Sequence, residues 1–466
     1  MRIKVQLLIE SAGLKPTTVE ITTIERKALD AGSLGLHMSE AKTLLQALQS
    51  SMVSAQVAEF LDEARICPEC QARRSLKDHH EIVYRSVFGK LRLDSPRLYH
   101  CHACDGSRRS FSPLAERLPE RSSPELQYLQ SKFSALMSYG LTVGVLGAVL
   151  PLDNVLAVSS VRRQAKSTSS RLKRDQQDDH TQAICRFELP QPYIPQPSPV
   201  KAIGVDGGYV RLAGHASRHD GWFEVIVGKS QRDDGEGGCF AYVHRLESDP
   251  SRRMEHFFTQ EGIRRDQPVT FLSDGGDTVR QGQFGPGRFG EWILDWFHIA
   301  MRFQNLIQIA KGLPEGEDLP RREQIVRDLE GAKWHLWHGC WYRCINRLES
   351  LTFDAAAFDM CEAGRKLAAK LDECITYLER NRGFIVDYGD RYRHGEVIAS
   401  SFVESAVNQV VSKRFCKKQQ MSWSPVNADC LLQVRTAVLN EKLRSHFVRW
   451  YPSLAPANEE ANKMAA

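Results

Sequence analysis

The sequence lacks a strong excess of either charge. Its 466 residues hold 62 Lys+Arg against 57 Asp+Glu, a formal net charge of +5. This balance excludes a histone-like or polybasic protein, so any nucleic-acid affinity must come from local patches. Apolar residues make up 42% and charged residues 26%, which excludes collagen-like, coiled-coil and fully disordered chains. We therefore expect a globular protein of several domains.

A secretory start and a convincing membrane span are also missing. Residues 1–10, MRIKVQLLIE, contain no uninterrupted apolar core, and no small-residue cleavage site follows them. Residues 133–152 carry no charge, but glycines, a proline and hydroxyl side chains make them too polar for a bilayer. The sequence thus predicts a cytoplasmic protein without a membrane partner.

No internal repeat is visible, and changes of pattern divide the chain. Apolar alternation predicts strands at 3–10 and 18–25, and helical spacing follows over 38–64. Five prolines between 190 and 199 predict an extended linker. The predicted segments are 1–64 (α+β), 65–120 (the cysteine module), 121–180 (helical), 181–199 (linker), 200–298 (strand-rich), 299–395 (all-helical), 396–450 (helical) and 451–466 (disordered tail).

The cysteine module carries the most specific spacing in the chain. With no secretion signal, the 12 cysteines argue against a disulfide framework. CPEC and CHAC each place two cysteines three residues apart, and they flank a β-rich stretch; these cysteines are Cys67, Cys70, Cys101 and Cys104. Four converging thiolates suit a closed, structural Zn²⁺ site in a zinc ribbon. His100 or His102 could replace one thiolate as a ligand.

A basic helix is predicted near the end of the helical module. Between residues 162 and 174 the chain has no acidic residue but six basic ones, namely Arg162, Arg163, Lys166, Arg171, Lys173 and Arg174. Such a helix fits the second helix of a helix-turn-helix, with its cations on DNA phosphates. The alternative is an ordinary solvated helix face, which would normally carry acids among the bases.

Two acids end apolar strands and are followed by glycine pairs. Asp206 closes AIGVD and Asp274 closes VTFLSD. Neighbouring strand ends can bring two carboxylates to divalent metal ions, although each Asp-Gly alone also fits a simple turn. DGGYVRLAG and DGGDTVR are also similar to phosphate loops of the sugar-kinase, actin and heat-shock ATPase superfamily. Members of that superfamily have an adenosine-binding glycine cluster late in the chain, whereas no glycine follows residue 400 here.

Three later segments point to another family. They are ILDWFHIAMR at 293–302, WHLWHGCW at 334–341 and the stretch SSFVESAVNQVVSKRF…MSWS at 400–424. In this order, they resemble the Kra-type insertion-sequence transposases of bacteria, within the Mutator-like DDE superfamily. The resemblance covers roughly residues 65–440. It implies an RNase H-like catalytic domain, interrupted by an all-helical insertion before its last acid, that cuts and joins DNA strands.

The family's acids fall on residues of this chain. The resemblance implies a catalytic triad of Asp206, Asp274 and Glu404, and a D-x-x-H element at Asp295 and His298. His298 would contact the scissile phosphate or hold Asp295, and Asp295 is itself a rival for the second metal. After Glu404, the basic residues Lys413 and Arg414 suit a DNA backbone. SSFVESA departs from the family in having few glycines, which affects the loop more than the acid.

The sequence and the resemblance together predict a DNA transposase. The expected fold is multi-domain α/β, in which a zinc ribbon and a helical DNA-binding module precede an RNase H-like domain with its mixed sheet. Mg²⁺ or Mn²⁺ would be catalytic and Zn²⁺ structural. The partners would be double-stranded DNA, as terminal inverted repeats and target, and further copies of the chain, with action at the bacterial nucleoid. The alternative is a domesticated DNA-binding protein that has lost catalysis.

Overall fold

The computed structural model divides into two compact units. The first unit holds Met1–Thr168 and Lys442–Ala466, and the second holds Ser169–Glu441. Helix α5, Val158–Phe187, begins in the first unit and ends in the second. The structure describes residues 1–10, 16–27, 29–31, 33–104, 109–152, 156–187, 197–214, 221–281, 290–314, 319–358, 360–416 and 421–455.

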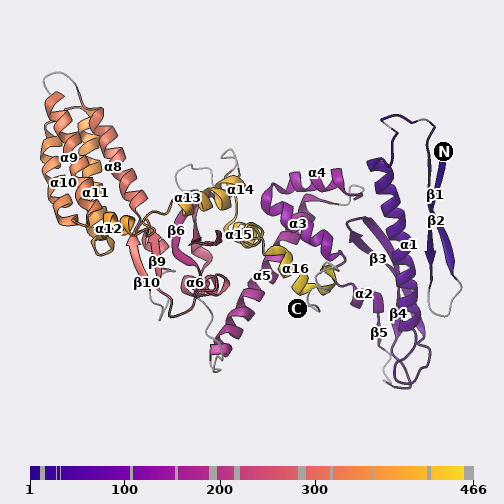
Figure 1. Ribbon diagram of the computed structural model, residues 1–466. Helices are drawn as coiled ribbons and strands as arrows, with labels where there is room; N and C mark the ends of the chain where they lie inside the picture. Colours follow the sequence, from indigo (N-terminus) through magenta and orange to yellow (C-terminus); the bar gives the residue numbers. More distant parts are fainter. Residues whose placement is uncertain are drawn as a thin grey trace. The chain divides into compact units, whose positions relative to one another are not determined.

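The first unit begins with β-structure around one long helix (Figure 1). Strands β1 (Arg2–Ile9) and β2 (Thr17–Glu25) pair antiparallel, and α1 (Met38–Ala64) follows, as the sequence patterns predict. Strands β3 (Leu76–Ser86), β4 (Gly89–Tyr99) and β5 (Ser110–Phe111) form a second antiparallel sheet. Apolar residues of α1 pack on this sheet because Val53, Val57, Phe60 and Leu61 recur at helical spacing.

Short helices complete the first unit. They are α2 (Pro113–Arg117), α3 (Pro124–Leu136), α4 (Tyr139–Val149) and, from the far end of the chain, α16 (Leu443–Trp450). Helix α3 begins as predicted, with the Ser123 hydroxyl accepting from the Leu126 amide at 3.3 Å and Pro124 in the first turn. The helices α3 and α5 meet through buried polar groups, since Ser131 and Thr168 share a hydrogen bond of 2.8 Å.

The second unit is built on a five-stranded mixed sheet. Its strands are β6 (Val200–Arg211), β7 (Trp222–Arg232), β8 (Glu236–Val243), β9 (Val269–Ser273) and β10 (Gly290–Leu294). In space the order is β10-β9-β6-β7-β8. Strands β6, β7 and β8 run antiparallel in succession, whereas β9 and β10 run parallel to β6.

Helices cover both faces of this sheet. On one face, α6 (Pro250–Gln260) buries Met254, Phe257 and Phe258 against residues such as Ile203 and Val205. On the other face, α13 (Ser401–Val407) lies so close to β6 that a Cβ at Gly204 would be 2.1 Å from a Val403 methyl carbon. Alternate residues of β6 therefore serve different helices, as expected for a strand buried on both sides.

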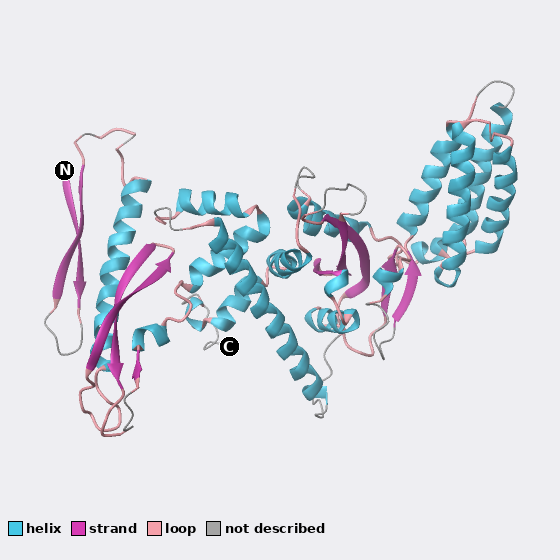
Figure 2. Ribbon diagram, turned by 180° about the vertical axis from the view of Figure 1, so that it is seen from behind, coloured by secondary structure: helices cyan, strands magenta, loops and turns pink. Residues whose placement is uncertain are grey.

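An all-helical block separates β10 from α13 in the sequence. It comprises α8 (Trp296–Lys311), α9 (Leu319–Trp337), α10 (Trp341–Ala356), α11 (Glu362–Arg380) and α12 (Tyr388–Arg393), with a short 3₁₀ turn at Arg382–Phe384. Figure 2 shows these helices in cyan as a separate bundle without strands. Leucines and isoleucines of α8 to α11 form its core. This block agrees with the predicted helical segment at 299–395.

The chain returns from the block to cover the edge of the sheet. After α13 come a π-helical turn (Asn408–Ser412), α14 (Lys413–Phe415) and α15 (Pro425–Leu439). Strand β8 ends the sheet on one side, and its outward backbone groups bond to side chains from α15 and the residue after it. The Val243 amide donates to Asp429, the Ala241 carbonyl accepts from Gln433, and Cys239 exchanges two bonds with Asn440.

Some predicted boundaries differ from the structure. Helix α5 runs to Phe187, so the first part of the expected linker at 181–199 is helical, while residues 188–196 lie outside the described residues. Helix α16 groups with the first unit, so the predicted segment 396–450 does not stay in one unit. In the expected tail at 451–466, Pro452–Leu454 forms a 3₁₀ turn, and residues from 456 onward lie outside the described part.

Candidate functional site

Two of the predicted acids come from neighbouring parallel strands. Asp206 lies inside β6, which continues to Arg211, so this acid does not end its strand as the sequence predicted, whereas Asp274 directly follows β9. Between β6 and β9, Gly204 lies opposite Leu272. Asp206 and Asp274 each follow two residues later, and residues two apart on a strand share a face. Asp206 therefore lies on the same face of β6 as Gly204, the face that α13 covers. The Asp274 charge raises the pKa of Asp206, so Asp274 is nearby, just after the carboxyl end of β9. We call this place the carboxylate edge.

Asp206 is held where its charge is unfavourable. Burial raises the pKa of this carboxyl group above its ordinary value; the His298 charge and a 2.7 Å hydrogen bond from the Gly207 amide oppose the rise, and Asp274 and Asp295 add to it. Carboxylates that gather out of water repel one another unless a cation joins them. The donor set, made of hard carboxylate oxygens, fits Mg²⁺ or Mn²⁺.

The loop of Asp274 is fixed by the helical block. The Gly276 amide donates to the Asp274 carboxylate at 2.9 Å, and the Tyr377 hydroxyl of α11 donates to the Asp274 carbonyl at 2.9 Å. Gly275 has a φ of +87°, and a Cβ there would lie 2.5 Å from the Asn381 oxygen. Glycine is required at 275 by this backbone conformation and by the close approach of Asn381.

A cavity of about 620 Å³ opens beside Asp274, between the loop and α11. Three arginines line it, namely Arg280, Arg302 and Arg380. The Arg280 guanidinium pairs with Asp277 at 2.8 Å, and that of Arg302 lies over the Tyr377 ring, 3.8 Å from its centroid. The helical block thus brings Arg302 and Arg380 to this cavity, together with the acids Asp372 and Glu373.

Asp295 joins three segments of the chain. Its side chain is fully buried, and its Oδ1 accepts from the amides of Phe297 at 2.9 Å and Ser400 at 3.0 Å. Its Oδ2 accepts from the Ser400 hydroxyl. Asp295 therefore ties the end of β10 and the start of α8 to the residue that precedes α13. With its oxygens occupied in this way, it is a poorer candidate for the second metal than Asp274.

His298 lies one helical turn after Asp295. Its Nε2 is 3.6 Å from the Asp295 carboxylate, and its side chain is 30% exposed. A protonated His298 also lowers the pKa of Asp206 and of Asp295, although burial outweighs it at both. The imidazole is therefore close to both acids and still open to solvent, which leaves both predicted roles available to it.

Glu404 lies on α13 and is exposed. The helix is fixed by its apolar neighbours, because a Cβ at Gly208 would lie 3.1 Å from a Val407 methyl carbon. In the described part of the chain, Asp206, Asp274 and Glu404 do not form a group with all ligand atoms within 4.8 Å. Glu404 is thus on the helix that covers the Asp206 face of the sheet, but the three carboxylates do not converge on one point.

A π-helical turn follows α13 directly. Such a turn leaves carbonyl groups without their usual helical donors, and π-turns are frequent near functional sites. The buried Arg435 of α15 supplies the donors, with Nε 2.9 Å from the Val410 carbonyl and Nη2 bonded to that of Gln409. Burial lowers the pKa of Arg435 to about 10. Periodicity in the sequence predicts a continuous helix and gives no signal for this turn.

Glu224 of β7 is a further acid near the carboxylate edge that the sequence patterns missed. Its Oε1 accepts from the Thr278 hydroxyl at 3.0 Å, and a Cβ at Gly207 would lie 3.0 Å from the same oxygen. Its register partner is Tyr209, so it lies on the sheet face opposite to Asp206. A glutamate in an ordinary alternating strand carries no motif that could have identified it.

The four predicted cysteines come together. Among the described residues, the sulfur atoms of Cys67, Cys70, Cys101 and Cys104 all lie within 4.8 Å of one another. Backbone amides of Cys70 and Glu69 lower the pKa of Cys67 to about 7, which favours the thiolate. This cluster could bind a structural metal such as zinc.

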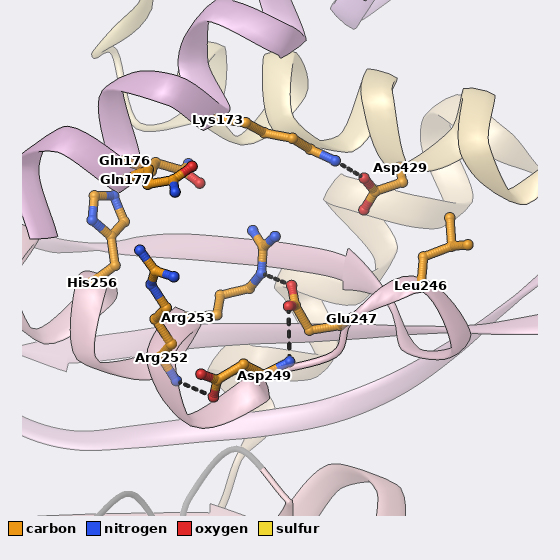
Figure 3. Close-up of a pocket in the computed structure, with 10 residues that line it drawn as sticks. All are labelled: Lys173, Gln176, Gln177, Leu246, Glu247, Asp249, Arg252, Arg253, His256 and Asp429. Atoms are coloured by element: carbon orange, nitrogen blue, oxygen red, sulfur yellow. Dashed lines mark hydrogen bonds and ion pairs between the residues drawn. The ribbon is translucent and has the colours of Figure 1, made fainter.

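The basic residues of α5 have different surroundings. Four of the side chains are exposed, namely those of Arg162, Arg163, Lys166 and Arg174. Arg171 is half-buried. Lys173 pairs with Asp429 of α15 across a pocket of about 260 Å³ (Figure 3). In the same view Arg253 pairs with Glu247, and Asp249 accepts from the Arg252 amide. Within the second unit, Lys173 thus links the later part of α5 to α15, and direct DNA contact by this residue would need that pair to open.

The two cations predicted after Glu404 do not form one surface. Lys413 is exposed, whereas Arg414 is only 2% exposed and its guanidinium lies 5.1 Å from the centre of the Trp423 ring. In this structure, Arg414 is therefore part of the interior beside β6, and the expectation of a DNA-facing side chain does not hold for it.

Comparison with known proteins adds no assignment. The chain matches no family model, and none of the curated proteins matches it. Within the described residues, every helix falls short of the combined length and apolarity that crossing a bilayer requires.

Proposed function

We propose that the protein is a DDE transposase that binds the ends of an insertion sequence and catalyses DNA strand cleavage and strand transfer. The observation that carries the proposal is that Asp206 on β6 and Asp274 just after β9 come from adjacent parallel strands, while Glu404 lies on α13, the helix that packs on the Asp206 face of β6. The order of strands, with three antiparallel and two parallel to the first, also supports an RNase H-like domain.

Asp206, Asp274 and Glu404 would hold the divalent cations. Bound there, Mg²⁺ or Mn²⁺ would polarise the scissile phosphate and lower the pKa of an attacking water or 3′-hydroxyl. The chain's own part is positioning. Tyr377 and the Gly276 amide fix Asp274, and the Gly207 amide orients Asp206. Catalysis of phosphoryl transfer depends mainly on such placement and on charge neutralisation.

Asp295 acts here as a positioning residue. About a hundred residues of helical block lie between β10 and α13, so the chain itself does little to fix where Glu404 begins its helix. The two bonds from Ser400 to Asp295 supply that connection. We therefore assign the cation-binding acids as Asp206, Asp274 and Glu404, with His298 completing the group around Asp206.

Recognition of DNA would fall to the first unit and α5. The cysteine cluster, as a zinc ribbon, and the exposed cations Arg162, Arg163, Lys166 and Arg174 would contact the terminal inverted repeats. Since cutting both ends of an element requires pairing them, we expect several copies of the chain in the DNA complex. Action on chromosomal DNA would place the protein at the bacterial nucleoid in the cytoplasm.

The test is a strand-cleavage and strand-transfer assay on the element's terminal DNA with Mg²⁺. We expect Asp206→Asn and Glu404→Gln each to lower the rate by at least roughly a hundredfold while binding persists. Glu349→Gln is the matched control, because this glutamate is exposed on α10, away from the carboxylate edge.

Two results would contradict the proposal. If the unaltered protein binds the ends but cuts nothing with Mg²⁺ or Mn²⁺, it is a DNA-binding protein without catalysis. If it binds ATP in a nucleotide titration and ignores DNA, the kinase-like alternative is correct. Equal activity of Glu404→Gln and the control would instead remove Glu404 from the triad.

A further inference from the structure

The cysteine module contains a second feature beside its cysteine cluster. A cavity of about 600 Å³ lies between the chain that follows the first cysteine pair and the chain around the second pair. Arg73, Arg74 and Lys77 line it from one side, and His100 and His102 from the other. Every residue of this cavity belongs to the first unit.

The cavity has permanent cations on one side and imidazoles on the other. It has three permanent positive charges and two imidazoles, and no carboxylate occurs among the described residues that line it. This contrasts with the pocket in Figure 3, where Lys173 and Arg253 face Asp429 and Glu247. Within the described chain, Arg73 has no side-chain partner. A cavity with three cationic side chains and no carboxylate among its described lining residues is suited to an anion.

Arg74 is fixed in place with a donor to spare. Its Nη1 donates to the Ala64 carbonyl at 2.8 Å, and its guanidinium lies 5.2 Å from the centre of the Phe111 ring. Its Nε is buried and has no hydrogen-bond partner in the described part of the chain. Lys77 is also partly oriented, since its Nζ donates to the Ser110 hydroxyl at 3.2 Å.

We propose that this cavity binds a phosphodiester group of the DNA backbone. The inference rests on the proposed function and deepens it, because it assigns phosphate contacts to the cysteine module itself. Arginine and lysine are the side chains that bind phosphate most often, and a fixed guanidinium loses little freedom on binding. Contacts of this kind set the register of a protein on the duplex without reading its bases.

The competing explanation is that the cations serve the metal. Four thiolates around one Zn²⁺ leave a net charge of −2, which nearby arginine and lysine would offset. The two explanations differ in what is lost on removing the cations. If the cations bind phosphate, removing them weakens DNA binding and its dependence on salt. If they offset the charge of the metal site, removing them weakens zinc binding.

The experiment measures the dissociation constant for terminal DNA over a series of KCl concentrations. The variant is Arg73→Ala/Lys77→Ala, and the control is Lys90→Ala/Arg92→Ala, which removes the same charge from the adjoining β3–β4 hairpin outside the cavity. We expect the slope of log K against log[KCl] to fall by up to about 2 for the variant, at roughly 0.9 per lost phosphate contact. The zinc content should stay unchanged.

The weakening should be similar for terminal and unrelated DNA, because phosphates carry no sequence. An equal slope for the variant and the control overturns the proposal, and so does loss of zinc from the variant. Arg73→Gln/Lys77→Gln keeps side-chain length and checks that any effect is due to charge. A failed phosphate site would leave strand cleavage by the unaltered protein intact, whereas failure of the proposed function would remove it.

Discussion

The two candidate metal sites of this protein differ in how completely the fold assembles them. The four cysteine sulfurs lie within 4.8 Å of one another without any ion. At the carboxylate edge, Asp206 and Asp274 come from adjacent parallel strands, but Glu404 is exposed on its helix. The fold alone brings the four sulfur ligands of the first site together, whereas it brings only part of the second site's ligands together.

The difference follows from chemistry and from distance along the chain. Each cysteine pair spans four residues, so a tight turn brings its sulfurs together, and neutral thiols do not repel one another. The acids come from residues 206, 274 and 404, on separate elements, and their charges repel. A structural site can be complete before its metal arrives, whereas a catalytic one gains by closing on cation and substrate.

Loss of a thiolate should have the largest effect. We expect Cys67→Ser to release the metal and to unfold the cysteine module, since structural zinc contributes roughly 10–16 kcal/mol to the folding of small zinc domains. Metal content and hydrogen exchange over β3 to β5 measure this. Cys430→Ser, on α15, is the control that should keep both properties. If the purified protein contains no bound metal, the cysteine cluster is not a structural metal site.

An intermediate effect is expected where Asp295 connects the two sides of the helical block. Asn at 295 can accept the Ser400 amide but leaves the hydroxyl poorly paired, and an unsatisfied buried group costs roughly 1–3 kcal/mol. Asp295→Asn should lower strand cleavage roughly a hundredfold through misplacement of Glu404, with DNA binding kept.

Substitutions at Ser400 test whether Asp295 positions Glu404 or binds the metal ion directly. Ser400→Thr keeps the hydroxyl and should restore most of the activity that Ser400→Ala loses, at unchanged Mg²⁺ dependence. If Asp295→Asn instead raises the Mg²⁺ concentration needed while Ser400→Ala has no effect, Asp295 binds the cation itself.

The smallest effect concerns stability at the carboxylate edge. Burial holds the pKa of Asp206 above its ordinary value, so the ionised group disfavours the folded state. This penalty disappears as pH falls through the raised pKa. Asp206→Asn should therefore unfold at a higher temperature than the unaltered protein at pH 7 without divalent ions, and the gap should close toward pH 4. Calorimetry measures it, with Asp62→Asn, an exposed aspartate of α1, as the control; a lower unfolding temperature for Asp206→Asn contradicts the repulsion.

Much of this arrangement could be predicted from local patterns. The paired cysteine spacing identified its cluster, and apolar runs that end in Asp-Gly identified the strands of Asp206 and Asp274. Glycines at 204 and 208 have a role that the sequence does not indicate. They make room for Val403 and Val407 of α13.

Other features depend on contacts between distant residues and leave no local signal. Arg414 and Lys173 look like surface cations in the sequence, yet one is buried beside Trp423 and the other pairs with Asp429. The α3–α5 contact uses Ser131 and Thr168, so apolar periodicity could not locate it. Helix α16, near the end of the sequence, belongs to the first unit, and no sequence pattern near residue 443 predicts this.

The side chains on β8 have one more consequence. An edge strand with open backbone groups is a template on which another chain can add a strand, as in aggregation or domain swapping. Asp429, Gln433 and Asn440 occupy the outward groups of Val243, Ala241 and Cys239. This margin of the sheet is therefore closed to intermolecular strand pairing, and any assembly of several copies would have to use other surfaces.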